Sequence, residues 1–269
     1  MAPWRVIDTG ADPGAYNMGV DQALAEGAAR GPVLRFYGWD PPAVSCGYGQ
    51  RVEREVNLDA CRALGVDVVR RPTGGRAVLH WEELTYSVVC DPDDFDMGAG
   101  IENAHRVIAE CLAEGLRGFG VAVDLERTRR PVEWSRGPQA TSPCFSSAAR
   151  WELKCGGRKL VGSAQRRLRE GMLQHGSILL GRAHERLPQL MRIDQAQCRE
   201  WTAALQAGSI DLGRCVPHPV ERDELVGCLV SGFAQRLGVE MRWDGLGADE
   251  KRRAVALAGA SVELEEFGV

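Results

Sequence analysis

The chain has 269 residues, which suits one large domain or one domain with a short appendage and leaves room for a sizeable core. Apolar residues make up 44% and charged residues 26%, as in ordinary globular proteins, and no apolar run approaches the roughly 18 residues that span a bilayer. The net charge is 33 − 37 = −4, which does not favour nucleic acid as a partner.

Apolar residues recur with helical periodicity at four places along the chain. One of the predicted helices also has good end signals, because Asn57 is a favourable N-cap and Gly65 a favourable residue just past the end. The predicted helices, in chain order, are residues 15–30, 58–64, 101–117 and 221–237. We expect one further short helix, followed by a tail, in residues 246–269.

Short runs typical of β-strands fill the intervals between these helices. They are residues 33–38, 43–48, 66–70, 84–90, 121–125, 150–155, 159–168, 173–180 and 239–243. Because only a few residues, including Gly171, separate 159–168 from 173–180, that pair is predicted to form a hairpin. The pattern predicts an α/β (α+β) fold with a mixed, largely antiparallel sheet flanked by helices.

Residues 128–149 contain three prolines and many small polar residues, which is typical of a long irregular loop. Cys144 lies in this loop beside Pro143, whereas most other cysteines occupy apolar periodic positions and are interpreted as small core residues. Arginines that closely precede Cys144 would raise its thiolate fraction. Cys144 is therefore the best candidate nucleophile, although the sequence alone leaves its role open.

Positive charge is concentrated around this loop. Residues 127–169 contain eleven Lys or Arg and two Asp or Glu, 11 − 2 = +9, so the rest of the chain carries −13. A basic stretch is usually a solvated face, but this one surrounds the candidate chemistry. We therefore also expect it to attract an acidic partner.

The nine cysteines form an odd count without a CxxC pair, which argues against a disulfide framework and against a thiolate zinc site. The first residues, MAPWRVIDTGADPG, contain no apolar segment of the kind found in secretory signals. We expect a reducing cytoplasmic location and no bound metal.

Three further segments are candidates for chemistry. In the segment Arg70–His80, a pair of glycines would let the backbone approach a ligand closely, although a glycine-rich turn with two surface arginines fits as well. Lys159 is followed by small residues up to Gln165, which would allow close approach, but a surface lysine is the commoner case. His175, beside a glycine in a predicted strand, is interpreted as structural support near the site.

Together these segments resemble the lipoate/biotin protein ligase superfamily, over roughly residues 4–240. Asn17-Met18 with Asp21 resembles its N-terminal helix, and residues 34–50 resemble its opening strands. The glycine-rich and lysine segments follow in the same order. The resemblance implies a catalytic domain in residues 1–245, with a mixed sheet, and a short C-terminal helix and tail in 246–269.

Within this superfamily the chain is most similar to the ligase-like class of octanoyl-[acyl carrier protein]:protein N-octanoyltransferases. In that class the cysteine that matches Cys144 carries a thioester, and the lysine that matches Lys159 lowers the pKa of that cysteine. Arg76 stands where ATP-dependent lipoate ligases typically have a third glycine. One departure is Trp81, where the family usually has an acidic residue.

The resemblance implies Cys144 and Lys159 as catalytic residues and no cofactor, with apolar neighbours such as Leu79 lining an acyl tunnel. The implied substrate-binding residues are Arg70, Arg71, Gly74, Gly75, Arg76, Ala77, Val78, His80, Gly162, Ser163, Ala164 and His175. The implied partners are octanoyl acyl carrier protein as donor, and lipoyl domains of 2-oxoacid dehydrogenases or the glycine-cleavage H protein as acceptors. Neither nucleic acid nor a membrane is expected.

Three alternatives stay open. In an ATP-dependent lipoate ligase, which would need ATP and Mg²⁺, Lys159 and Arg71 would bind lipoyl-adenylate and Cys144 would be incidental. A non-catalytic subunit would capture lipoyl domains without turnover. An amidotransferase would move the acyl group from the H protein to other lipoyl domains by similar covalent chemistry.

Overall fold

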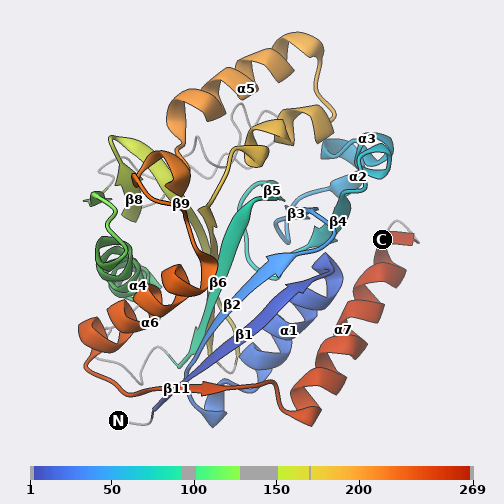
Figure 1. The fold of residues 1–269 in the computed structure, drawn as a ribbon. Coiled ribbons are helices and arrows are strands. Elements are labelled where there is room, and N and C mark those ends of the chain that lie inside the picture. Colours follow the sequence, from blue (N-terminus) through green and yellow to red (C-terminus); the bar gives the residue numbers. More distant parts are fainter. Residues whose placement is uncertain (1–2, 92–100, 128–150, 170, 267–269) are drawn as a thin grey trace.

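The computed structural model describes residues 3–91, 101–127, 151–169 and 171–266. Its strands form two sheets (Figure 1). The larger, eight-stranded sheet has the order β11-β1-β2-β6-β10-β9-β8-β7, and the smaller has the order β4-β3-β5. The strands are β1 (Trp4–Asp12), β2 (Val33–Trp39), β3 (Ala43–Cys46), β4 (Asp67–Arg70), β5 (Val78–His80), β6 (Glu83–Cys90), β7 (Val123–Arg127), β8 (Trp151–Cys155), β9 (Arg158–Arg167), β10 (Met172–Leu179) and β11 (Met241–Asp244).

Both sheets are mixed. Strand β1 pairs in parallel with β2 and β11, whereas the pairs from β2 through β6, β10, β9 and β8 to β7 are all antiparallel. In the small sheet β3 is parallel to β4 and antiparallel to β5. The predicted largely antiparallel mixed sheet is confirmed, as is the hairpin, formed by β9 and β10.

Helices cover both faces of the large sheet (Figure 1). The α-helices are α1 (Gly14–Glu26), α2 (Val52–Glu55), α3 (Leu58–Ala63), α4 (Ile101–Gly118), α5 (Gln195–Gly208), α6 (Arg222–Leu237) and α7 (Ala248–Glu266), and the 3-10 helices are η1 (Ala28–Arg30), η3 (Ala183–Leu190) and η4 (Leu212–Arg214). The four predicted helices correspond to α1 with η1, α3, α4 and α6. The Asn57 side chain caps α3 as expected, accepting a hydrogen bond from the Ala60 N–H at 3.2 Å.

Two pairs of helices pack closely through small residues. A Cβ added at Gly232 of α6 would lie 2.3 Å from the backbone nitrogen of Gly115 in α4, so only glycine permits this helix contact. Likewise a Cβ at Gly19 of α1 would lie 2.4 Å from the Ala254 carbonyl oxygen in α7. Helices α4 and α6 enclose the main apolar core against one face of the large sheet, and α1 and α7 enclose a second core.

The C-terminal helix is longer than the short helix expected there. It packs along α1, and Arg5 of β1 binds Glu250 of α7 at 2.8 Å. Ala254 of α7 is buried in the second core, and its carbonyl oxygen lies against Gly19 of α1. The predicted boundary between residues 245 and 246 stays a prediction.

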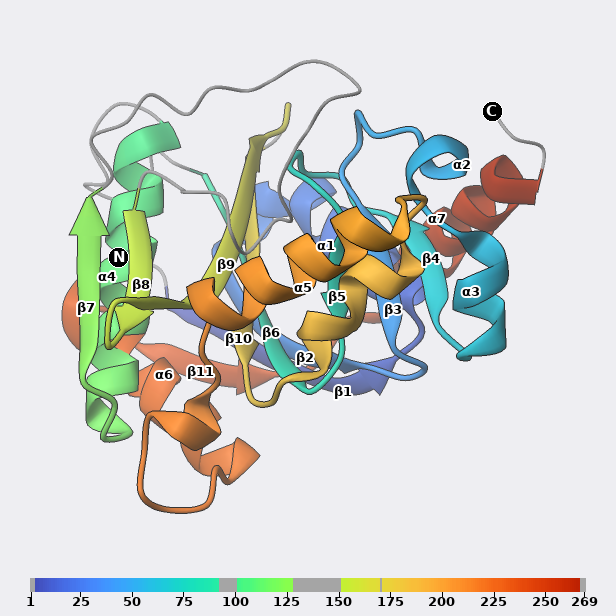
Figure 2. The same cartoon turned by 90° about the horizontal axis from the view of Figure 1, so that it is seen from above.

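The small sheet lies beside the large one, and a third apolar cluster joins it to α3, η3 and α5 (Figure 2). This arrangement brings the loop between β4 and β5 toward strands β9 and β10 of the large sheet. In the described part of the chain, no helix is long and apolar enough to cross a membrane.

Candidate active site

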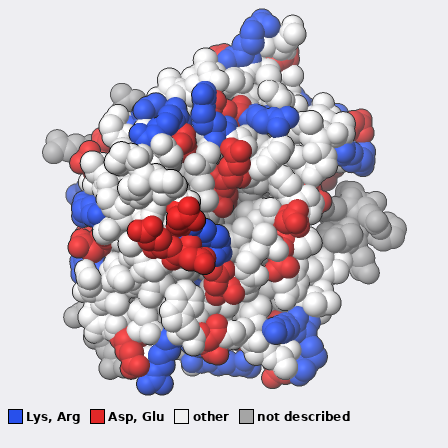
Figure 3. All heavy atoms as spheres, in the orientation of Figure 1, with Lys and Arg blue, Asp and Glu red and all other residues white. Residues whose placement is uncertain are grey.

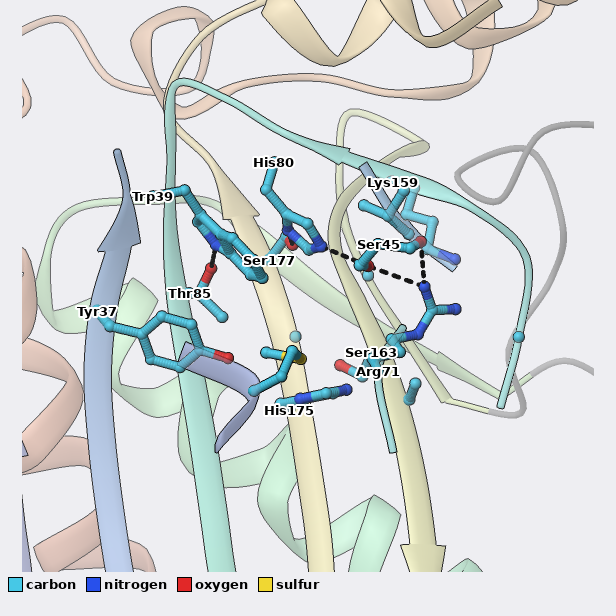
Figure 4. A pocket seen from close by; sticks show the side chains of 16 residues that line it. Tyr37, Trp39, Ser45, Arg71, His80, Thr85, Lys159, Ser163, His175 and Ser177 are labelled. Atoms are coloured by element: carbon cyan, nitrogen blue, oxygen red, sulfur yellow. Dashed lines mark hydrogen bonds between the residues drawn. The ribbon is translucent and has the colours of Figure 1, made fainter. Parts of the chain in front are cut away.

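A pocket lies where residues of both sheets meet α1 (Figure 4). Its lining comes from α1, from β2, β6, β9 and β10 of the large sheet, and from β3, β5 and the loop before β5. The lining residues are Met18, Tyr37, Trp39, Ser45, Arg71, Gly75, Val78, His80, Thr85, Lys159, Gly162, Ser163, Ala164, His175, Gly176 and Ser177. Cations, hydroxyl groups, imidazoles and apolar side chains therefore face one cavity.

Arg71 organises the glycine-rich loop. Its buried guanidinium donates to the Ser45 carbonyl at 2.7 Å and hydroxyl at 2.9 Å, and to the Gly74 and Arg76 carbonyls at 2.9 and 2.7 Å. Its Nε also donates to the Gly74 carbonyl at 3.2 Å. Since these five contacts engage all three of its nitrogens, Arg71 brings positive charge to the pocket while its N–H groups hold the loop.

The same loop lies tightly against the strand that precedes it. A Cβ added at Gly47, directly after β3, would lie 2.2 Å from the Gly75 carbonyl oxygen, and Gly75 itself has φ +99°. Gly75 lines the pocket, whereas a Cβ added at Gly74 would lie 3.7 Å from the Tyr48 ring. The close backbone packing here joins Gly75 to Gly47, and the predicted close approach of the glycine pair to a ligand stays a prediction.

His175 is held between a hydroxyl and a buried carboxylate. Its Nδ1 lies 3.0 Å from an Asp21 oxygen, and its Nε2 lies 2.6 Å from the Thr73 hydroxyl. Burial lowers the pKa of His175 despite the neighbouring carboxylate. A neutral ring that donates from Nδ1 to Asp21 must accept at Nε2 from Thr73, so His175 anchors the glycine-rich loop to the large sheet.

Asp21 is fully buried and collects hydrogen bonds from four side chains. Besides His175, it accepts from Arg35 at 2.8 Å, Tyr37 at 2.9 Å and Ser87 at 2.8 Å. Burial by itself raises the pKa of Asp21, but the hydrogen bond from His175 and the charge of Arg35 outweigh burial and leave that pKa below its usual value. An ionised carboxylate at this point ties α1 to β2, β6 and β10.

His80 has an equivalent arrangement on the other side of the pocket. Its Nδ1 donates to Glu83 at 2.8 Å, its Nε2 accepts from the Ser45 hydroxyl at 2.7 Å, and its ring stacks on Trp39 with centroids 4.0 Å apart (Figure 4). Thr85 also donates to Glu83, at 2.6 Å. This second histidine therefore joins the small sheet to the large sheet as His175 does.

Lys159 projects from β9 into the pocket and is 6% exposed. Its Nζ lies 3.3 Å from Glu152, and the other oxygen of Glu152 lies 3.4 Å from the Nζ of Lys154. Glu152 is likewise 6% exposed. Near Lys159, burial and then the charge of this lysine lower the pKa of His105 to about 4, so His105 is neutral at neutral pH.

Ser163 receives its orientation from Tyr86. The two hydroxyl oxygens lie 2.7 Å apart, and the Gln174 amide donates to Tyr86 at 2.9 Å, which leaves the phenol hydrogen for Ser163. Burial raises the pKa of Tyr86 to about 12, so the phenol keeps its hydrogen. The hydroxyl hydrogen of Ser163 can then point into the cavity.

Most of the site residues expected from the sequence meet at this pocket. The predicted residues that line it are Arg71, Gly75, Val78, His80, Lys159, Gly162, Ser163, Ala164 and His175. Four others support it from outside: Gly74 and Arg76 through their carbonyl groups, Ala77 from the third apolar cluster, and Arg70, which donates to the Tyr48 and Gln50 carbonyls. Leu79 belongs to that cluster too and does not line the pocket, because successive residues of β5 face opposite sides.

Cys144 and the irregular loop around it lie outside the described residues, so its placement relative to Lys159 stays a prediction. The eight other cysteines are all free, and five of them are buried. Burial raises the pKa of Cys111 to about 12, which suits the interpretation of such cysteines as small core residues.

Several residues of the site were not among those expected from the sequence. They are Met18, Tyr37, Trp39, Ser45, Thr85, Gly176 and Ser177 in the lining, and Asp21, Glu83 and Glu152 behind it. Asp21 and the residues of β2 and β3 lie in segments that carried the family resemblance, so that resemblance was the available signal. Glu152 gave no local signal, because its role depends on the pairing of β8 with β9.

Comparisons with known proteins agree with this geometry. Residues 13–234 match a family described as the lipoyl protein ligase A/B catalytic domain. Octanoyltransferase LipM of Kyrpidia tusciae is 39% identical over 261 residues, covering 96% of this chain and 95% of that protein. Octanoyltransferase LipM of Bacillus subtilis is 36% identical over 244 residues, covering 88% of this chain and 87% of that protein.

Solved structures with the same fold include a lipoate-protein ligase A bound with ATP, with a TM-score of 0.78, 25% identity and coverage of 99% of this chain and 98% of that one. A bipartite lipoate protein ligase from Thermoplasma acidophilum, described with its E2 lipoyl domain, also has a TM-score of 0.78 and 25% identity, and the coverage is 99% and 95%. The expected fold and superfamily are confirmed. The chain belongs to the lipoyl protein ligase A/B catalytic-domain family.

Proposed function

We propose that this protein is an octanoyltransferase of lipoate biosynthesis, which moves an octanoyl group from acyl carrier protein to a lysine of a lipoyl domain or of the glycine-cleavage H protein. The observation that carries the proposal is the buried ammonium of Lys159 in the pocket of a chain that matches octanoyltransferases over nearly its whole length. The free thiols of the described cysteines agree with work in a reducing cytoplasm.

In the proposed first step, the Cys144 thiolate attacks the carbonyl carbon of the carrier's thioester. The bond between that carbon and the carrier sulfur breaks, the carrier leaves as a thiolate that takes up a proton, and octanoyl-Cys144 remains. One thioester replaces another, so this step needs no ATP. The positive charges of Lys159 and Arg71 stabilise the thiolate and the developing oxyanion.

In the second step, the neutral amine of the acceptor lysine attacks the acyl-Cys144 carbonyl. The bond from carbonyl carbon to sulfur breaks, Cys144 leaves as a thiolate beside Lys159, and the amine nitrogen loses a proton as the amide forms. The amide is more stable than the thioester, so transfer runs forward. Val78 and the side chains of Met18, Tyr37 and Trp39 give the pocket an apolar side for the acyl chain.

Charge also bears on the partners. Acyl carrier proteins and lipoyl domains are typically acidic, which fits the basic segment 127–169. On the face shown in Figure 3, acidic and basic side chains are interspersed and acidic ones gather near the centre, so that face offers no wholly basic surface. We expect the partners to approach elsewhere.

The test is to incubate the protein with octanoyl acyl carrier protein and determine its intact mass. An octanoyl adduct is expected on the wild-type chain and on Cys198→Ala, a matched control on the partly exposed Cys198 of α5, and is expected to vanish in Cys144→Ala. Transfer to a lipoyl domain without any adduct would refute the covalent mechanism.

Two further arms separate the alternatives. Modification that requires ATP would indicate a lipoate ligase, the activity named for the neighbouring solved structure. Preference for octanoyl-H protein over the carrier would indicate an amidotransferase, and binding of lipoyl domains without turnover would indicate a capture subunit.

A further inference from the structure

Tyr48 lies beside the pocket and contacts two arginines. A Cβ added at Gly74, directly before the lining residue Gly75, would lie 3.7 Å from the Tyr48 ring, yet Tyr48 is 58% exposed. The guanidinium of Arg166 covers this ring, with its central carbon 4.6 Å from the ring centroid. Arg70 donates to the Tyr48 carbonyl at 3.2 Å. One guanidinium from each sheet, β4 in the small one and β9 in the large one, therefore meets at an exposed tyrosine.

Backbone carbonyl groups hold both guanidinium groups in place. Arg70 donates through Nη1, to the carbonyls of Tyr48 and of Gln50, the latter at 2.7 Å. Arg166 also donates through Nη1, to the Pro72 carbonyl at 2.6 Å. Within the part of the chain that the structure describes, Nε and Nη2 of each arginine have no acceptor. A group that is fixed in this way loses little freedom when a ligand binds it.

The positive charge of the two arginines has no matching carboxylate among the described residues, where neither Arg70 nor Arg166 forms an ion pair. The carboxylate of Glu55, which lies beside Gln50, accepts from the Gln50 amide and from the Arg51 N–H, the latter at 3.2 Å. Nε and Nη2 lie on one edge of a guanidinium and form a fork of parallel donors. Two such forks match the oxygens of a phosphate group.

A ligand bound by these arginines can reach into the pocket. Arg166 follows the lining residue Gly162 on β9 by 166 − 162 = 4 positions, which corresponds to about 13 Å along the strand. Acyl carrier proteins hold their acyl group on a phosphopantetheine arm. The bonds between phosphorus and sulfur of that arm number about 13, and an extended chain of this length spans about 16 Å. An arm whose phosphate lies at Arg166 can therefore place its thioester in the pocket.

We propose that Arg70 and Arg166 bind the phosphate group of the donor's prosthetic arm, and that Tyr48 is the surface that keeps Arg166 in position. The inference rests on the proposed function and identifies the part of the donor that the protein recognises. The phosphate lies far from the reacting carbonyl, so the two arginines act in binding and positioning and are not catalytic residues. An acceptor lysine carries no phosphate and gains no such contact, which lets the site distinguish donor from acceptor.

The experiment compares two small donors that differ only in the phosphate, octanoyl-phosphopantetheine and octanoyl-pantetheine. In wild type the first should have a kcat/KM about tenfold or more above the second, mainly through KM, as expected for hydrogen bonds to a charged group. Arg70→Gln and Arg166→Gln should each lower this ratio, and the double variant should bring it close to one. Because both donors are measured on the same protein, a loss of folded enzyme does not change the ratio.

The matched control is Arg62→Gln. It removes an arginine of α3 whose side chain is 73% exposed and pairs with Asp59, so the ratio should stay at the wild-type value. Tyr48→Leu removes the ring beneath Arg166 but leaves both charges, so it should lower the ratio less than Arg166→Gln does. Added salt should lower the ratio of wild type and leave that of the double variant unchanged, because salt screens exposed charges.

A binding measurement without turnover separates this inference from the proposed function. In a ³¹P NMR titration, phosphopantetheine should bind to wild type and not to the double variant, even if no octanoyl transfer occurs. Failure of wild type to bind phosphopantetheine, or equal kcat/KM for the two donors, would overturn the inference. Tighter binding of adenosine 5′-monophosphate than of phosphopantetheine would overturn it too, because the two arginines would then serve a nucleotide.

Discussion

The buried pair of Asp21 and Arg35 provides a sharp test of how the site is held together. Both side chains are 0% exposed, and their atoms lie 2.8 Å apart. The substitution Asp21→Asn keeps the shape but removes the charge and exchanges an acceptor oxygen for an NH₂ donor. Arg35 would then keep its charge inside the protein without a carboxylate.

The cost follows from two contributions. Breaking a buried ion pair from one side costs about 3–5 kcal/mol. With one acceptor oxygen lost, at least one of the donors from Tyr37, Ser87 and His175 also loses its acceptor, for about 1–3 kcal/mol. The expected loss of unfolding free energy is on the order of 5 kcal/mol, against a typical total of about 5–15 kcal/mol.

The assay is urea unfolding followed by far-UV circular dichroism at pH 7. Asp59→Asn is the matched control, since the carboxylate of Asp59 is 91% exposed and its pair with Arg62 is worth about 0–1 kcal/mol. In the double variant Arg35→Met with Asp21→Asn, the loss should be smaller than in either single variant, because no buried charge then lacks its partner. A loss below about 1 kcal/mol in Asp21→Asn would refute the reasoning.

The pH dependence of this pair has a definite sign. The pKa of Asp21 is lowered in the folded protein, so its ionised form stabilises the fold above the ordinary value of about 3.9. That contribution disappears as the pH falls through the lowered pKa. The difference in stability between wild type and Asp21→Asn should therefore shrink in strong acid, and a difference that grows there would contradict the assignment.

Three further changes have equally definite outcomes. Gly176→Ala would place a Cβ 2.4 Å from the Gly162 carbonyl oxygen in the wall of the pocket. The steady-state kcat/KM for transfer should therefore fall at least tenfold, which corresponds to about 1.4 kcal/mol of transition-state stabilisation. Wild-type activity in this variant would contradict the packing. Gly47→Ala would push on the Gly75 carbonyl from 2.2 Å and should raise KM for the acyl donor, whereas Gly49→Ala, with nothing within 4 Å, should not. Burial lowers the pKa of His105 to about 4, so the unfolded chain binds more protons than the folded chain between about pH 4 and 6.5. As the pH falls through that window, the unfolding free energy of wild type should drop by up to about 3 kcal/mol, and that of His105→Asn should drop less. Parallel pH curves of the two proteins in urea unfolding would contradict this expectation.

Local sequence signals were sufficient for the elements whose burial pattern is regular. Helix α4 repeats its apolar residues at helical spacing, and α3 carries its own cap at Asn57, so both were predictable without knowledge of any partner. Strand β1 was missed, since the partners of its charged residue Arg5 lie near the other end of the chain, at Asp244, Gly245 and Glu250. Helix α5 was missed because it buries only Trp201 and Leu205.

The same distinction divides the site. The sequence by itself determined the glycine-rich loop and Lys159, because close backbone approach and a lysine among small residues are properties of neighbours along the chain. Only the tertiary structure decided which charges and hydroxyl groups meet them. Asp21 reaches His175 across 154 positions, and Glu152 reaches Lys159 through strand pairing, because long-range packing rather than local spacing places these partners within hydrogen-bond distance.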